Sequence, residues 1–288
     1  MTSMPIPSHS RAPSLEEVEA RVQAENRARK SSQKRNQILA PILLLVAILV
    51  IWEAAAAILS IPRYLLPAPT EIARTMVNRI ELILQQSWVT SIEVMLGFGM
   101  SVVVGVPLAM GIVRWKAFST AVYPLLVSAQ TIPKVAVAPL FIVWFGFGLA
   151  PKVLIAFLIA FFPIVINTVM GLRAIEKEKI YLARSLGLSG VETFRLIRIP
   201  DALPSIFAGM KISVTLAVVG AVVGEFVGGD AGLGYMLLIA NGSLDTPLLF
   251  CGIIALTCLG FFFYYLIELV ERLALPHLYS KGGDSSGH

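Results

Sequence analysis

The sequence has few charged residues and few of the side chains that carry enzyme or metal chemistry. Only 14% of its 288 residues are charged and 57% are hydrophobic, whereas a soluble domain carries about 25% charged residues. It contains three histidines and only two cysteines, Cys251 and Cys258, which share one apolar run and exclude a disulfide scaffold. With a mean hydropathy of +0.80, there is too little polar surface to cover a soluble body. The composition indicates an integral membrane protein.

Motifs for nucleotide, metal and nucleophilic chemistry are also missing. The sequence has no G-x-x-x-x-G-K-[ST] loop, no H-E-x-x-H, no Cys/His cluster at metal-ligand spacing and no G-x-S-x-G elbow. We therefore expect no catalytic residue, no metal site and no cofactor in this chain. A membrane enzyme is disfavoured for the same reason, and any ATP that drives the protein must be hydrolysed by a separate subunit.

Long apolar runs are abundant. A bilayer core about 30 Å thick requires roughly 20 apolar residues in a helix, and continuous runs without alternation exclude a lipid-facing barrel. Six stretches are long enough: Ile38–Ile61, Val89–Val113, Phe118–Phe145, Val153–Leu172, Ile206–Val227 and Leu248–Leu275. The third contains three prolines, which kink or break helices, so it can be two pieces. The sequence predicts an all-α membrane protein with six transmembrane helices.

The basic residues are distributed unevenly between the loops. Eighteen of the 23 Lys and Arg residues fall on the side that holds both termini and the loop after the fourth span, and basic loops stay in the cytoplasm. The opposite side holds Arg63, Arg74, Arg79 and Lys152. We expect a cytoplasmic N-terminal arm (residues 1–37) without a cleavable signal, a transmembrane domain (38–275) and a cytoplasmic tail (276–288). A capping box at residues 14–17 predicts a short solvated helix in the arm.

The loop after the fourth span, about residues 173–204, is longer than most helix connections and is patterned. Lys177–Leu186 predicts a helix that Gly187 ends. A capping box at residues 189–192 begins a second short helix, which we expect Pro200 to stop. The pattern predicts a cytoplasmic helix-turn-helix.

Residues 181–206, YLARSLGLSGVETFRLIRIPDALPSI, resemble the coupling loop of ABC-importer permeases. The family pattern is E-A-A, then a glycine, then I-x-L-P. Ala183 and Gly187 match the last alanine and the glycine, whereas Tyr181 and Leu182 replace the glutamate and the first alanine. The I-x-L-P end is matched by Ile197, Ile199 and Pro200. The resemblance implies that these residues dock on an ATPase subunit.

Three further segments resemble the branch of that family that handles nitrate, sulfonate, taurine and bicarbonate. They are LLPAPTEI (65–72), TIPKVAVAPLFIVWFGFG (131–148) and EFVGGDAGLGYML (225–237). The resemblance covers about residues 40–275. It implies a type I ABC importer fold, a bacterial inner-membrane location, separate ATPase subunits, an extracytoplasmic binding protein and a second permease, identical or paralogous. The cargo it favours is a small anion, whose identity stays open.

Ionisable residues at membrane depth are costly and point to function. We hypothesise that Lys134, beside Pro133 in the third span, faces the translocation pathway and attracts an anion; the alternatives are pairing with a buried carboxylate or snorkelling. Glu93 and Glu225 are candidates for gating or pairing in the pathway, with a purely structural role as the alternative. A secondary transporter driven by ions could use these three residues as a relay, although it would not need the patterned loop.

Small residues recur on the fifth span. Gly220, Gly224 and Gly228 are spaced by four and form a stripe that allows close helix approach. The stripe predicts a helix interface, either within the subunit or against a second copy.

Overall fold

A computed structural model describes residues 39–276. The predicted N-terminal arm and nearly all of the C-terminal tail lie outside the described residues. The chain divides into two units on either side of Ile61 and Pro62. The first contributes one helix, Leu39–Ile58, which is long and apolar enough to cross a membrane.

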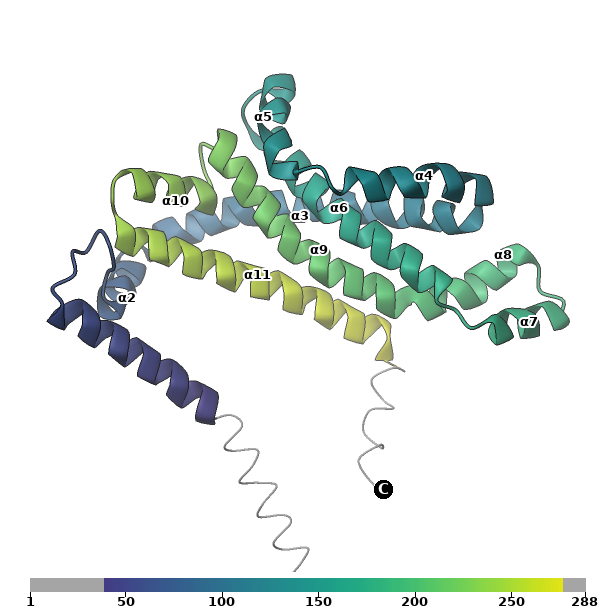
Figure 1. Cartoon of the computed structure of the whole chain (residues 1–288), viewed down its shortest axis with the longest axis horizontal. Coiled ribbons are helices and arrows are strands. Elements are labelled where there is room, and N and C mark those ends of the chain that lie inside the picture. Colours follow the sequence, from purple (N-terminus) through teal and green to yellow (C-terminus); the bar gives the residue numbers. More distant parts are fainter. Residues whose placement is uncertain (1–38, 277–288) are drawn as a thin grey trace, which may run out of the picture. The chain divides into compact units, whose positions relative to one another are not determined.

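The second unit is helical, and the described residues contain no strand (Figure 1). Its elements are α2 (Pro69–Asn78), α3 (Ile80–Arg114), α4 (Lys116–Ala129), α5 (Lys134–Phe145), α6 (Leu149–Arg173), α7 (Lys177–Ser185), α8 (Gly190–Thr193), the π-helical turn η1 (Phe194–Arg198), α9 (Ile199–Gly228), α10 (Leu233–Gly242) and α11 (Thr246–Ala274).

Over the described range, five helices can each cross a membrane, and the pair α4 and α5 raises the number to six if it is one broken span. This confirms the predicted all-α membrane architecture. The pair is bent by 97°, with its break just before Lys134, whereas Pro124 and Pro139 lie inside the two helices. Helix α3 is longer than the predicted span, because it begins at Ile80 rather than near Val89.

Helix α6 lies at the centre of the second unit, packed against α3 and α9. Small residues allow this contact. A Cβ atom at Gly220 would lie 2.6 Å from Ala156 Cα, and one at Gly224 would lie 2.8 Å from Lys152 Cα. Gly228 meets the Ile142 side chain of α5 in the same way. The glycine stripe therefore packs inside the subunit. Because glycine has no side chain, the α9 and α6 backbones can lie close together there.

The expectation that Pro200 stops the second loop helix is wrong. The helix runs from Gly190 through η1 to Gly228, with Pro200 in the first turn of α9. Proline lacks an N–H and clashes with the preceding turn. A π turn immediately before it rearranges the hydrogen bonds, as π-bulges do inside helices, so the chain passes the proline without stopping.

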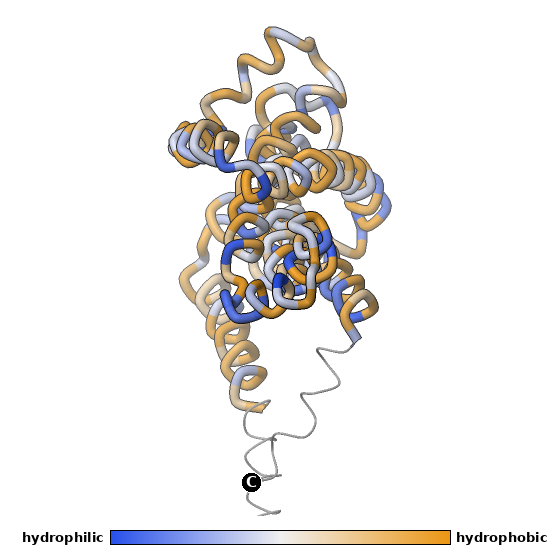
Figure 2. The backbone as a smooth tube through the Cα atoms, turned by 90° about the vertical axis from the view of Figure 1, so that its right-hand side faces the viewer, coloured by the Kyte–Doolittle hydropathy of each residue, from blue (hydrophilic) through white to orange (hydrophobic). Residues whose placement is uncertain are grey.

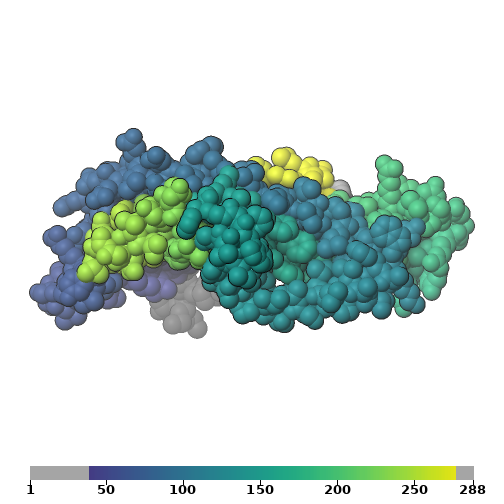
Figure 3. Space-filling view, turned by 90° about the horizontal axis from the view of Figure 1, so that it is seen from above, coloured from purple at the N-terminus to yellow at the C-terminus, as the bar shows by residue number. Residues whose placement is uncertain are grey.

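Helices α4 and α5 cover one face of this bundle (Figure 3). Both are apolar, yet α4 has no buried residue and α5 buries only Ala138. Hydrophilic residues are frequent in the α7–α8 segment, which lies at the end of the bundle that faces the viewer in Figure 2. This leaves two contrasting ends, with α10 at one and α7 and α8 at the other (Figure 1).

Candidate functional site

The turn between α7 and α8 is fixed by its own hydrogen bonds. Gly187 has φ of +80°, a left-handed conformation that glycine adopts at little cost. The Leu188 N–H donates to the Ala183 carbonyl and the Gly187 N–H to the Arg184 carbonyl, each at 3.0 Å. These two bonds form a Schellman motif, which ends α7 as the sequence predicts.

Helix α8 begins with the predicted capping box. The Glu192 N–H donates to Ser189 Oγ at 3.3 Å, and the Ser189 N–H donates to Glu192 Oε2 at 2.8 Å. These reciprocal bonds satisfy two N–H groups that the helix start would leave unpaired. Together with the glycine turn, they give the loop a defined shape without any partner.

The loop presents apolar side chains outward. The exposed residues, which we call the loop surface, are Tyr181, Leu182, Leu186, Val191 and Leu196, each at least 60% exposed. Of the other residues that match the coupling pattern, Ala183 is buried, Ile197 and Ile199 are half-buried and Pro200 is exposed. Large exposed apolar side chains on a loop outside the membrane spans are typical of a surface that another molecule covers.

The opposite end of the unit contains a buried ion cluster. Lys152, near the start of α6, lies 3.1 Å from a Glu93 carboxylate oxygen of α3 and 3.2 Å from Asp230 Oδ1. Its side chain and that of Glu93 are buried, whereas Asp230 is largely exposed. The lysine thus joins α3 and α6 to the loop that follows α9.

A second carboxylate completes this cluster. The Glu225 side chain is fully buried, accepts a hydrogen bond from Thr90 Oγ1 at 2.6 Å and accepts another from the Gly234 N–H. Gly232 has φ of +110°, and a Cβ atom there would collide with the Glu225 carboxylate. Glu225 therefore holds the start of α10 against α3 by bonding the backbone directly.

The enclosed positions of Glu93 and Glu225 favour pairing over a place on the pathway wall. The sequence analysis placed Lys152 on the side opposite the two termini and did not connect it to these acids. The sequence could have predicted this pairing. Buried acids require a cation at the same depth of the membrane, and Lys152 lies directly before the fourth predicted span, on the side where Glu93 and Glu225 lie. Thr90 carried no such signal, because a threonine in an apolar helix usually bonds its own backbone.

Lys134 stands apart from the ion cluster, at the break between α4 and α5. Its amine donates to the Gln130 carbonyl at 2.6 Å and lies 4.9 Å from the centroid of the Phe162 ring. It borders a recess of about 460 Å³ whose polar lining includes Gln130 and Asn167. The structure thus brings together Glu93 and Glu225 but not Lys134, contrary to a single relay of the three.

The sequence matches the family described as the inner membrane component of binding-protein-dependent transport systems, over residues 101–275. The chain belongs to this family. It is similar to the riboflavin transport system permease protein RibX of Chloroflexus aurantiacus, with 38% identity over 231 residues, 80% of this chain and 86% of RibX. SsuC of Bacillus subtilis, named for aliphatic sulfonates transport, is 32% identical over 257 residues, 88% of this chain and 92% of SsuC.

The fold is that of a solved permease as well. A chain of the inward-facing MetNI methionine ABC transporter superposes with a TM-score of 0.60 at 18% identity, covering 68% of this chain and 97% of that one. The expectation of a type I importer fold is confirmed. The chain is a multi-pass permease subunit of an ABC importer, of a family that resides in the inner membrane.

Proposed function

We propose that the loop surface docks on a separate ATPase subunit and carries its motion to the transmembrane helices. One observation supports this role: the loop exposes apolar side chains, and its own hydrogen bonds already fix its shape. Burial of such side chains drives association, and a preorganised loop loses little conformational freedom when it docks. The α7–α8 end is then cytoplasmic, as are both termini.

The wider assembly follows from the same proposal. A second permease, identical or paralogous, packs against the exposed apolar side chains of α4 and α5 and completes the translocation pathway. A substrate-binding protein delivers the solute at the α10 end. Neither this chain nor its partner permease needs a cofactor, since ATP binds to the ATPase subunits.

Pull-down of the tagged full-length chain from its native membrane tests the docking role. We expect a P-loop ATPase in stoichiometric amount with the wild type, and its loss from Leu182→Asp/Leu186→Asp, which places charge on the loop surface. Leu65→Asp is the matched control, because Leu65 is equally exposed but lies before α2. Recovery of the chain alone, with uptake that needs no ATP, would refute the proposal.

For the solute, we propose a small molecule with an anionic group that Lys134 contacts. The recess at the α4–α5 break offers an ammonium group, an aromatic ring and the side-chain amides of Gln130 and Asn167, a set suited to an acid with an apolar body. A charge-assisted hydrogen bond contributes about 1.5–3 kcal/mol. Loss of this contact would weaken solute binding roughly ten- to hundredfold.

Uptake by cells that express the complete importer tests the solute class. A panel of nitrate, bicarbonate, small sulfonates and riboflavin first identifies a transported solute. We expect Lys134→Met to raise its apparent KM at least about tenfold at equal expression, with partial recovery in Lys134→Arg. The control Lys116→Met removes an exposed lysine at the start of α4. Unchanged uptake of an anion by Lys134→Met, or a neutral solute, would exclude this role.

A further inference from the structure

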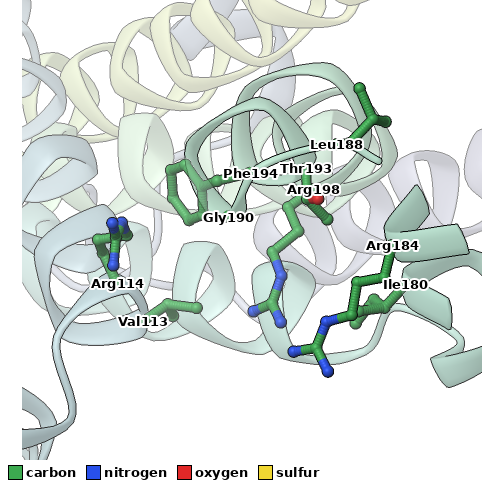
Figure 4. Close-up of a pocket in the computed structure, with 9 residues that line it drawn as sticks. All are labelled: Val113, Arg114, Ile180, Arg184, Leu188, Gly190, Thr193, Phe194 and Arg198. Atoms are coloured by element: carbon green, nitrogen blue, oxygen red, sulfur yellow. The ribbon is translucent and has the colours of Figure 1, made fainter. Parts of the chain in front are cut away.

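Three arginines outside the loop surface and the ion cluster converge on a recess at the α7–α8 end. Arg114 is the last residue of α3, Arg184 lies in α7 and Arg198 ends η1. They line a recess of about 320 Å³, in which the Arg184 and Arg198 side chains extend in the same direction (Figure 4). Segments that are distant in the sequence therefore bring three permanent positive charges to one place.

These charges are not neutralised by the part of the chain that the structure describes. Between residues 39 and 276, no carboxylate lies within salt-bridge distance of the three guanidinium groups. Two acids of the same loop have other partners: Asp201 pairs with Lys179 at 2.7 Å, and Glu192 caps α8. Guanidinium groups do not lose their proton, so an anion in the recess would relieve their mutual repulsion.

Apart from the arginines and Thr193, the side chains that line the recess are apolar. Val113, Ile180 and Phe194 are among them. Arg114 ends the long apolar helix α3, so the recess lies at the depth where a membrane span passes into water. An anion bound there would have an apolar body beside its charge.

We propose that this recess binds the phosphate headgroup of an anionic membrane phospholipid. Arginine forks match phosphate oxygens in a bidentate way, basic pockets at the ends of spans suit anionic headgroups, and the apolar lining suits the start of an acyl chain. Because its walls come from α3, α7 and η1, such a lipid would tie the loop to a transmembrane helix. The proposal does not depend on the ATPase docking or on the transported solute.

Native mass spectrometry of the purified full-length chain, with phosphatidylglycerol or phosphatidylcholine added, tests the proposal. We expect the wild type to retain phosphatidylglycerol preferentially and Arg184→Gln/Arg198→Gln to bind it roughly 30-fold more weakly. This factor corresponds to about 1 kcal/mol per basic residue. Arg195→Gln is the matched control, since Arg195 lies on the same turn but does not line the recess. Arg184→Lys/Arg198→Lys keeps the charge but not the guanidinium fork, so it should bind more tightly than the Gln variant and less tightly than the wild type. An equal loss in the Lys and Gln variants, with a lowered unfolding midpoint, would indicate misfolding.

Three outcomes would overturn the proposal. Equal phosphatidylglycerol retention by the wild type and the double Gln variant would remove the arginines from lipid binding. Displacement of the lipid by millimolar inorganic phosphate would make the recess a site for free phosphate. Loss of a co-purifying ATPase from the double Gln variant, with lipid retention intact, would assign the arginines to an acidic surface of that subunit.

Discussion

The two ends of the bundle use charge in opposite ways. At the α10 end, Lys152 pairs with both Glu93 and Asp230, and Glu225 bonds the backbone of α10. At the α7–α8 end, three arginines face a recess without a carboxylate partner among the described residues, and the loop surface is apolar and exposed. At the α10 end, the buried charged side chains find their partners within the chain. At the α7–α8 end, the unpaired charges and exposed apolar side chains are typical of a surface that another molecule covers.

This difference indicates where stability and function reside. A buried charge that loses its partner is costly, so changes at the α10 end should act first on folding. Unpaired charges and exposed apolar side chains contribute little to the fold of the isolated chain, so changes at the α7–α8 end should act on partners. Each prediction below tests whether that separation holds.

The largest effect is expected for Lys152→Met. This change leaves Glu93 buried without its cation, and breaking a buried pair costs about 3–5 kcal/mol. Thermal unfolding of the purified chain in detergent should show a midpoint lower by several degrees. Lys116→Met, which removes an exposed lysine, should unfold like the wild type.

A double variant separates pairing from packing at the same position. Because an apolar pair often replaces a buried ion pair at little cost, Lys152→Met/Glu93→Met should recover part of the lost stability. If the double variant is no more stable than Lys152→Met alone, the lysine acts through its packing or through Asp230 rather than through Glu93.

An intermediate effect is expected for Gly187→Leu, at the opposite end. A left-handed conformation costs a residue with a side chain about 1–2 kcal/mol, and the Schellman turn that shapes the loop would weaken. Uptake and ATP hydrolysis by the complete importer should become uncoupled, while the unfolding midpoint of the chain falls less than in Lys152→Met. In the control Gly190→Ala, the added Cβ atom meets no atom within 4 Å, so coupling should persist. Coupled transport by Gly187→Leu would argue against the docking role of the loop.

The helices and the loop were predictable because their signals are local. Apolar runs of about 20 residues define spans, and Gly187, Ser189 and Glu192 define a turn and a cap through bonds to their own neighbours. The passage of α9 through Pro200 was not predictable in this way. A proline normally ends a helix, and nothing in the local pattern indicated the π turn that accommodates it.

The ion cluster and the arginine recess depend on contacts between distant segments. Lys152 meets Glu93 because α3 packs closely on α6, where a Cβ atom at Gly97 of α3 would lie 2.6 Å from Ala156 Cβ. No pattern within one segment encodes such a meeting. Lys152 could still have been predicted as the partner of these acids, because acids at one depth of the membrane require a cation at the same depth. For Arg114 and Arg198, no comparable signal exists.

The smallest effect is expected for Asp230, the solvent-exposed member of the ion cluster. The hydrogen bond from Lys152 lowers the pKa of the Asp230 carboxyl below its ordinary value. A group with a lowered pKa stabilises the fold above the pKa of the unfolded chain, and this contribution is lost as pH falls through the lower folded value. Since the carboxylate is largely exposed, solvent screening keeps its contribution below about 1 kcal/mol. Asp230→Asn should therefore lower the unfolding midpoint slightly between pH 5 and 8, and the difference from the wild type should shrink as pH falls below the ordinary pKa of an Asp carboxyl, about 3.9. A difference that persists in acid would mean that the Asp230 side chain stabilises the loop by its shape rather than by its charge, and that the two ends of the molecule differ less in their use of charge than their geometry indicates.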